Sequence, residues 1–116
     1  MKVYHITAES VWPETYFSIA SGRASLESVK DVLAGKVENL RYELVAEVDC
    51  DDLDDAYRLT NSIDEYWGEN EGVTDLTDGC RSTSVGDILE TSTGYKYVVA
   101  NFGFESLHGW IYNEHI

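Results

Sequence analysis

The segment from Glu47 to Asp87 carries most of the negative charge of the chain, and this limits where the segment can lie in a fold. Between Glu47 and Asp78 there are twelve acidic residues and a single basic residue, Arg58. The net charge of this stretch is −11, within a chain of −14. Such a charge keeps a small domain soluble but costs stability through self-repulsion. We therefore expect these acidic side chains to remain in water.

Length and composition predict a single acidic α+β domain over residues 1–116. With 43% hydrophobic and 12% aromatic residues, the chain can bury a core. No apolar run is long enough for a membrane span, and the first residues, MKVYHITAES, contain no apolar signal region. These features predict a cytoplasmic protein. Its two cysteines, Cys50 and Cys80, are expected to be free thiols there.

The charge also narrows the class of partner. Eight Lys and Arg residues are too few for phosphate binding, which argues against a direct complex with nucleic acid or anionic lipid. Clustered carboxylates instead suit a basic protein partner. The charge is also compatible with a simple need for solubility or with a salt-rich environment, and the oligomeric state stays open.

Four segments have the residue pattern of β-strands. They are Lys2–Thr7, Arg41–Asp49, Asp87–Thr91 and Tyr95–Phe102. The last two are expected to form a hairpin around Ser92, Thr93 and Gly94, because Gly94 can adopt a positive φ. Tyr95–Phe102 is apolar on both faces, which is typical of a central strand. Trp110–Tyr112 predicts one further short strand.

Arg41–Asp49 alternates between apolar and polar residues and predicts a strand with one wet face. The residues expected to face the core are Tyr42, Leu44, Ala46 and Val48. Those expected to face water are Arg41, Glu43, Glu47 and Asp49.

Thr15–Ala20 allows two interpretations. Its aromatic and β-branched residues, bounded by Ser21 and Gly22, predict a strand. A short helix that begins at Pro13 is the alternative.

Two helices are predicted. Leu26–Ala34 has Ser25 as a candidate N-cap and Gly35 as its end. The second helix runs from about Asp52 to Ile63, with Asp51 as its N-cap. Residues that recur with helical spacing form one side of this helix. They are Leu53, Ala56, Tyr57, Thr60, Ile63 and Trp67. The chain therefore predicts an α+β fold with a small, largely antiparallel sheet and two helices.

Acidic residues lie at both ends of the second helix, and only those at its start have a local explanation. The helix dipole and the free amides of the first turn account for Asp51, Asp52, Asp54 and Asp55. Acids at or beyond a helix C-terminus are slightly unfavourable, yet they continue through Tyr66–Gly79, which we interpret as a loop. We therefore predict a partner-binding surface on this part of the chain. Its residues are Asp54, Asp64, Glu65, Tyr66, Trp67, Glu69, Glu71, Asp75 and Asp78.

No catalytic or metal-binding pattern stands out. Counted from Asp49, the EF-hand positions for an acid, Gly and Glu hold Leu53, Asp54 and Thr60. The His and Cys residues lack the paired spacing of zinc sites, and thiolates are disfavoured beside so many acids. Arg81–Ser84 suits a turn that enters a strand better than an anion-binding nest. We therefore expect no enzyme activity, no catalytic residue, no metal and no cofactor.

The run RSTSVGDILETSTGYKYVVANFGFESL, from Arg81 to Leu107, resembles a motif of YodL-like and related small proteins of phages and plasmids. The shared pattern is Arg-Ser-x-Ser-Val-Gly-Asp, a strand, a turn, an aromatic strand and Phe-Gly-Phe. Upstream, DDLDDAYRLTNSI and WGENEGVT are similar to segments of uncharacterised phage proteins with the same ending. The resemblance covers Asp51 to about Leu107. It implies an origin in a mobile element and no catalytic function.

Two function classes are compatible with these features. The first is an inhibitor of a host nucleic-acid-targeting defence complex, of the anti-CRISPR or antirestriction type. Its carboxylates would stand in for phosphates on a basic surface of a host nucleic-acid-binding protein, in the host cytoplasm. The second is a non-inhibitory interaction or assembly module of a mobile element.

Overall fold

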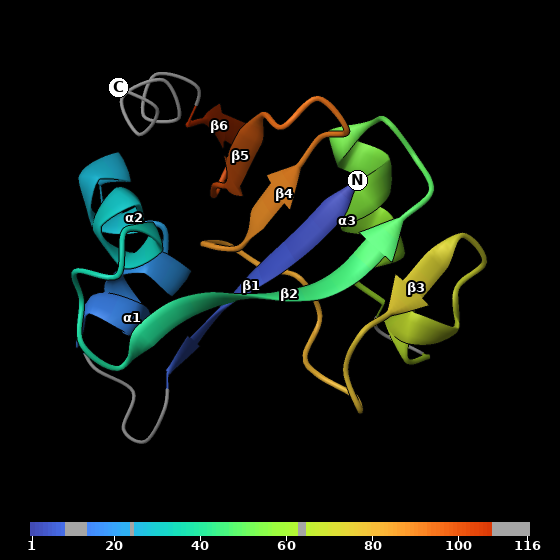
Figure 1. Ribbon diagram of the computed structural model, residues 1–116, viewed down its shortest axis with the longest axis horizontal. Coiled ribbons are helices and arrows are strands. Elements are labelled where there is room, and N and C mark those ends of the chain that lie inside the picture. The colour runs from blue at the N-terminus through green and yellow to red at the C-terminus, as the bar shows by residue number, and fades with distance from the viewer. Residues whose placement is uncertain (9–13, 24, 63–64, 108–116) are drawn as a thin grey trace.

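A six-stranded antiparallel sheet forms the middle of the computed structural model, which describes residues 1–8, 14–23, 25–62 and 65–107. The strands follow the order β3-β2-β1-β4-β5-β6 across the sheet (Figure 1). Their bounds are Lys2–Ala8 (β1), Leu40–Val48 (β2), Val73–Asp75 (β3), Ile88–Glu90 (β4), Lys96–Val99 (β5) and Phe104–Ser106 (β6). The predicted α+β class and the antiparallel sheet are confirmed.

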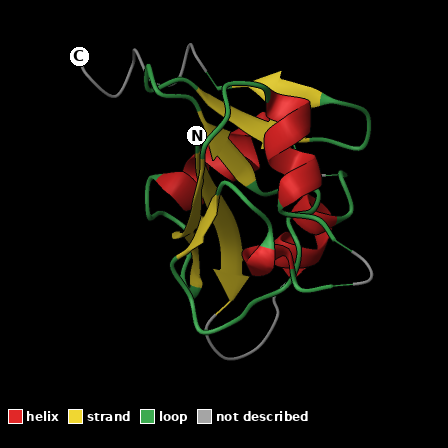
Figure 2. Cartoon of the chain, turned by 90° about the vertical axis from the view of Figure 1, so that its right-hand side faces the viewer, coloured by secondary structure: helices red, strands yellow, loops and turns green. Residues whose placement is uncertain are grey.

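Helices cover both faces of this sheet (Figure 2). They are α1 (Glu14–Ala20), α2 (Leu26–Leu33), α3 (Leu53–Leu59) and the short 3-10 helix η1 (Trp67–Glu69). On one face α1 and α2 pack over Ile6 and Ile88, and on the other α3 and η1 pack over Val3 and Leu89. Each buried aliphatic side chain contributes about 1.5–3 kcal/mol, so both clusters hold helices against the sheet. The described part of the chain thus contains three α-helices where two were expected.

The additional helix is α1, and the strand predicted over Thr15–Ala20 is wrong. The alternative helix accounts for this segment, because Tyr16 and Ile19 lie one turn apart and are both buried against the sheet. Gly22 ends the helix with a φ of 75°, and its N–H donates to the carbonyl of Ile19 at 3.0 Å. Helical spacing therefore outweighed the β-forming composition.

The acidic helix α3 is shorter than the predicted Asp52–Ile63. Asp52, rather than Asp51, provides the N-cap hydrogen bond. The helix ends at Leu59 because the next carbonyl, that of Thr60, accepts a hydrogen bond from the Thr83 N–H at 2.8 Å. A contact with a distant part of the chain thus replaces the next helical turn.

A β-bulge divides β2 into two halves. Val3 lies opposite Ala46 and Tyr4 opposite Leu44, so Val45 has no opposite residue in β1. The core-facing side chains consequently change face, with Tyr42 packed on the α1 and α2 side and Ala46 and Val48 on the α3 side. The prediction of a single core face for β2 is therefore wrong. The prediction of the wet residues is confirmed, since the exposed residues include Arg41, Glu43, Glu47 and Asp49.

The β4–β5 hairpin is present where it was predicted. Gly94 has a φ of 91° in its turn. β5 is an inner strand paired with β4 and β6, although β1 and β4 lie nearer the centre of the sheet. The predicted strand to Phe102 ends earlier, because the chain turns there and returns as β6. The strand predicted at Trp110–Tyr112 lies outside the described residues.

Candidate protein-binding surface

Pairing of β2 with β3 brings two acidic segments together at one end of the sheet. Glu47 lies opposite Thr74, and the Asp49 N–H donates to the carbonyl of Gly72 at 2.8 Å. Glu71 therefore lies close to Asp49. We call the exposed acids of residues 47–54 and 65–78 the acidic surface. Its exposed residues are Glu47, Asp49, Asp51, Asp52, Asp54, Glu65, Glu69, Glu71 and Asp78.

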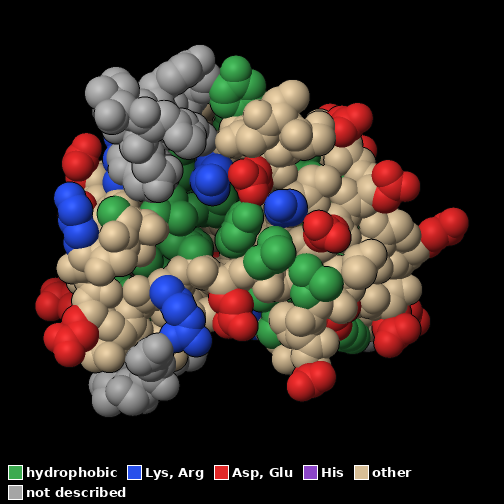
Figure 3. All heavy atoms as spheres, in the orientation of Figure 1, with side chains coloured by type: hydrophobic (Ala, Val, Ile, Leu, Met, Phe, Trp, Pro, Cys, Tyr) green, Lys and Arg blue, Asp and Glu red, His purple; other side chains and the backbone are tan. Residues whose placement is uncertain are grey.

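Most of the predicted binding carboxylates belong to this surface. Asp54, Glu65, Glu69, Glu71 and Asp78 are exposed, whereas Asp64 lies outside the described residues. The Asn70 side chain holds η1 to the end of α3, because its amide donates to the Leu59 carbonyl at 2.8 Å. On the face drawn in Figure 3, acidic side chains line the right-hand end, around β3, without Lys or Arg among them.

Trp67 is a correction to the predicted surface. Its side chain is only 1% exposed, inside the cluster between α3 and the sheet. The indole N–H donates to the carbonyls of Cys80 and Arg81 at 3.1 and 3.0 Å. A partner that docks on this fold therefore does not reach Trp67. Trp67 therefore anchors η1 to the rest of the domain.

Tyr66 and Asp75 are likewise used within the chain. The Tyr66 hydroxyl donates to the Asp75 carboxylate at 2.7 Å, and Thr77 donates to Asp75 through its N–H and its hydroxyl. Partial burial acts to raise the pKa of Asp75, but the hydrogen bonds from Tyr66 and Thr77 lower it below its ordinary value. Both side chains are half-buried and hold the η1–β3 segment in shape.

Each basic residue within the segment 47–87 forms an ion pair with an acidic residue of the same segment. Arg58 pairs with Asp55 at 3.1 Å on the surface of α3. Arg81 pairs with Asp87, with nitrogen–oxygen distances of 2.6 and 2.7 Å. Neither guanidinium is therefore free to neutralise the acidic surface.

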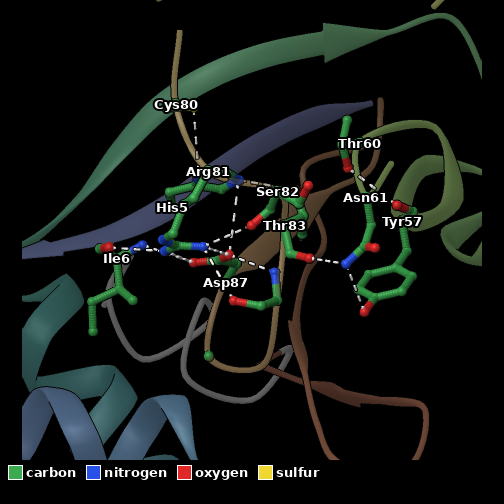
Figure 4. Close-up of polar contacts among 12 residues, drawn as sticks. His5, Ile6, Tyr57, Thr60, Asn61, Cys80, Arg81, Ser82, Thr83 and Asp87 are labelled. Atoms are coloured by element: carbon green, nitrogen blue, oxygen red, sulfur yellow. Dashed lines mark hydrogen bonds and ion pairs between the residues drawn. The ribbon is translucent and has the colours of Figure 1, made fainter. Parts of the chain in front are cut away.

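Asp87 forms the centre of a buried polar network (Figure 4). Its carboxylate is 0% exposed and accepts hydrogen bonds from the Arg81 side chain, the Ile6 N–H at 3.0 Å and the Ser84 N–H at 2.8 Å. Arg81–Ser84 was predicted as a turn that enters a strand rather than an anion nest. The turn in fact surrounds an anion, and that anion belongs to the chain itself.

His5 extends this network beneath the acidic segment. Its Nε2 lies 2.9 Å from the Thr83 hydroxyl, and its Nδ1 lies 3.8 Å from the sulfur of Cys80. Burial lowers the pKa of His5 to about 4, against the opposing attraction of Asp87. Burial also raises the pKa of the Cys80 thiol. At neutral pH this pair is a neutral imidazole beside a protonated thiol, which is a poor nucleophile.

Neither the buried network nor the contribution of Glu47 and Asp49 to the surface follows from the sequence pattern. Alternation correctly predicted that both acids are exposed. It did not predict that β3 pairs with β2 beside them, because a strand of three residues is too short to show alternation. The network joins residues far apart in the sequence, and a pattern within one segment carries no signal of that contact.

Comparison with known proteins adds no relative. The chain matches no family model, no curated protein and no solved structure. Within the described residues, no helix is long and apolar enough to cross a membrane. No group of three His, Cys, Asp or Glu side chains is placed for metal binding in those same residues. Cys50 and Cys80 are free thiols.

Proposed function

We propose that this chain is a phage- or plasmid-encoded inhibitor of a host nucleic-acid-targeting defence complex, of the anti-CRISPR or antirestriction type. It acts by binding, without catalysis. Its acidic surface occupies a basic groove that would otherwise hold nucleic acid. The resemblance of Arg81–Leu107 to proteins of mobile elements supports the setting, and the charge supports the mode of action.

One observation carries this proposal. The β2–β3 pairing sets the acids that follow β2 beside those of the η1–β3 segment, so two separate segments contribute to one surface. A purely solubilising charge does not require the acids to gather at one end. The hydrogen bonds of Trp67 and Asn70 fix the backbone that carries these acids. A fixed backbone loses less conformational entropy when a partner docks.

The test is inhibition of a purified restriction or CRISPR complex, with nucleic acid as competitor, across a salt series. Carboxylates that replace phosphates predict rapid association that weakens steeply as salt rises. The variant Glu69→Lys with Glu71→Lys should bind at least about tenfold more weakly, because two favourable charges become repulsive.

The matched control is Glu27→Lys with Glu38→Lys, two exposed acids on and just after α2, outside the acidic surface. This variant has the same net charge as the first and should inhibit like the unmodified chain. A binding affinity that changes neither with salt nor with the charge reversal at Glu69 and Glu71 would contradict charge mimicry. That result would favour the second function, a non-inhibitory assembly module of a mobile element.

A further inference from the structure

A groove with aromatic walls lies between α3 and the β5–β6 hairpin, next to the acidic surface. Its volume is about 210 Å³, and it is open to solvent. The rings of Tyr57 and Phe104 meet edge to face in its wall, with centroids 6.4 Å apart. Asn61 donates to the Tyr57 hydroxyl at 3.0 Å and so fixes that ring. Asp54, one helical turn before Tyr57, adds an exposed carboxylate to the lining.

The hairpin beside the groove presents an unusually exposed aromatic side chain. Phe102 is 96% exposed at the tip between β5 and β6, and its neighbours Asn101 and Gly103 line the groove. The tip is held in place, because the Asn101 amide donates to the Ser21 carbonyl at 3.3 Å. Nothing in the packing of the described residues accounts for a phenyl ring held in water at this position.

We propose that this groove binds an arginine-bearing, partly apolar segment of the basic partner protein, which makes this inference rest on the proposed function. A guanidinium can lie against the face of Tyr57 or Phe104 while it pairs with the carboxylate of Asp54. Apolar side chains of the same segment cover Phe102. Within the described residues Asp54 has no ion-pair partner of its own, so its charge is available.

The charge of the chain decides between this occupant and a second copy of the protein. Each copy carries a net charge of −14, and Asp54 at the groove would repel the acids of another copy. The same repulsion opposes insertion of Phe102 into an anionic membrane. A cationic protein segment meets no such barrier.

The experiment uses the ¹⁵N-labelled full chain and two acetylated, amidated peptides. One peptide has the sequence Leu-Arg-Leu-Arg-Leu, and the other has citrulline in place of each arginine. The arginine peptide should shift the amide signals of Tyr57, Val99 and Gly103, and the citrulline peptide should leave them unchanged. Phe102→Ser and Asp54→Asn should each weaken binding by about fivefold.

Phe17→Ser and Glu43→Gln serve as matched controls, because both residues are exposed outside the groove. Signal shifts spread over Glu69 and Glu71, with Phe102→Ser binding as tightly as the unmodified chain, would overturn the proposal. A dimer in sedimentation that Phe102→Ser dissociates would overturn it in favour of a second copy. Failure of host-complex inhibition while the arginine peptide still binds the groove would refute the proposed function and leave the groove assignment intact.

Discussion

At the scale of single residues, Asp87 holds together the two central strands of the sheet, β1 and β4. Its carboxylate is buried, which is costly for an isolated charge. Four hydrogen bonds offset that cost, two from Arg81 and one each from the amides of Ile6 and Ser84. Arg81 also donates to the Ile6 carbonyl at 3.0 Å, so one ion pair ties β1 to the turn before β4.

His5 beside this pair predicts a loss of stability in mild acid. Its pKa is about 4 in the folded chain and 6.5 ordinarily. Between these values the unfolded chain binds a proton that the folded chain does not, so stability falls as pH decreases from 6.5 to 4. The total loss from this group is about 3 kcal/mol. Urea unfolding at a series of pH values measures it.

The variant His5→Gln isolates this effect, because glutamine does not titrate. Its stability should fall less steeply than that of the unmodified chain, by about 1.4 kcal/mol per pH unit within the window. The carboxylates titrate in both proteins and cancel in the comparison. Equal slopes would show that His5 is not held neutral by the fold.

At the scale of elements, the bulge at Val45 explains how one strand serves two cores. Deleting Val45 should remove the bulge and leave Leu44 opposite Tyr4 and Ala46 opposite Val3, so that Glu47 stays in water and Val48 stays in the α3 cluster. The deletion loses only the buried side chain of Val45, so we expect the variant to unfold cooperatively in urea, with a stability lower by about 2–3 kcal/mol.

The control for this deletion is Val45→Ala, which removes volume and retains the register. It should remain folded and lose about 2 kcal/mol in urea unfolding. A deletion variant without a cooperative transition, while Val45→Ala stays folded, would show that the two halves of β2 depend on the bulge itself.

Elements whose signal is local could be predicted from the sequence. β1, α2 and the β4–β5 hairpin follow from alternation, from Gly35 after the helix, and from Gly94. Ser25 lies at the N-cap position of α2, but its side chain makes no capping hydrogen bond. The elements that were missed depend on distant contacts. α1 is a helix because Tyr16 and Ile19 pack together against the sheet. α3 ends where the Thr83 N–H donates to the Thr60 carbonyl.

The candidate site divides in the same way. The exposure of Asp54, Glu69 and Glu71 follows from charge, since a carboxylate is costly to bury. The helical period of the segment placed Trp67 on the apolar side of a longer helix, but α3 ends at Leu59 and Trp67 lies in η1. Its position depends on the carbonyls of Cys80 and Arg81, which reach it only in the folded chain.

At the scale of the whole molecule, the charge predicts opposite effects of salt on stability and on partner binding. Clustered acids repel one another in the folded state, and added NaCl screens them. Raising NaCl from about 50 to 500 mM should therefore raise Tm, by about 4 °C for a gain of about 1 kcal/mol. Calorimetry across the series measures this.

The double variant Glu69→Gln with Glu71→Gln should have a higher Tm at low salt and a smaller rise with NaCl. Both changes have one cause, since less repulsion remains to be screened. A Tm that falls with NaCl would contradict this account of the acidic surface.

The turn from Arg81 to Asp87 has a consequence for which residues related sequences would have in common. In the run RSTSVGD, the first and last residues form the buried ion pair, and the serine before Val85 donates its amide to the same carboxylate. Selection for a stable fold is enough to preserve such a run through evolution. Proteins that share it would therefore be expected to share an architecture, while their exposed acids remain free to differ.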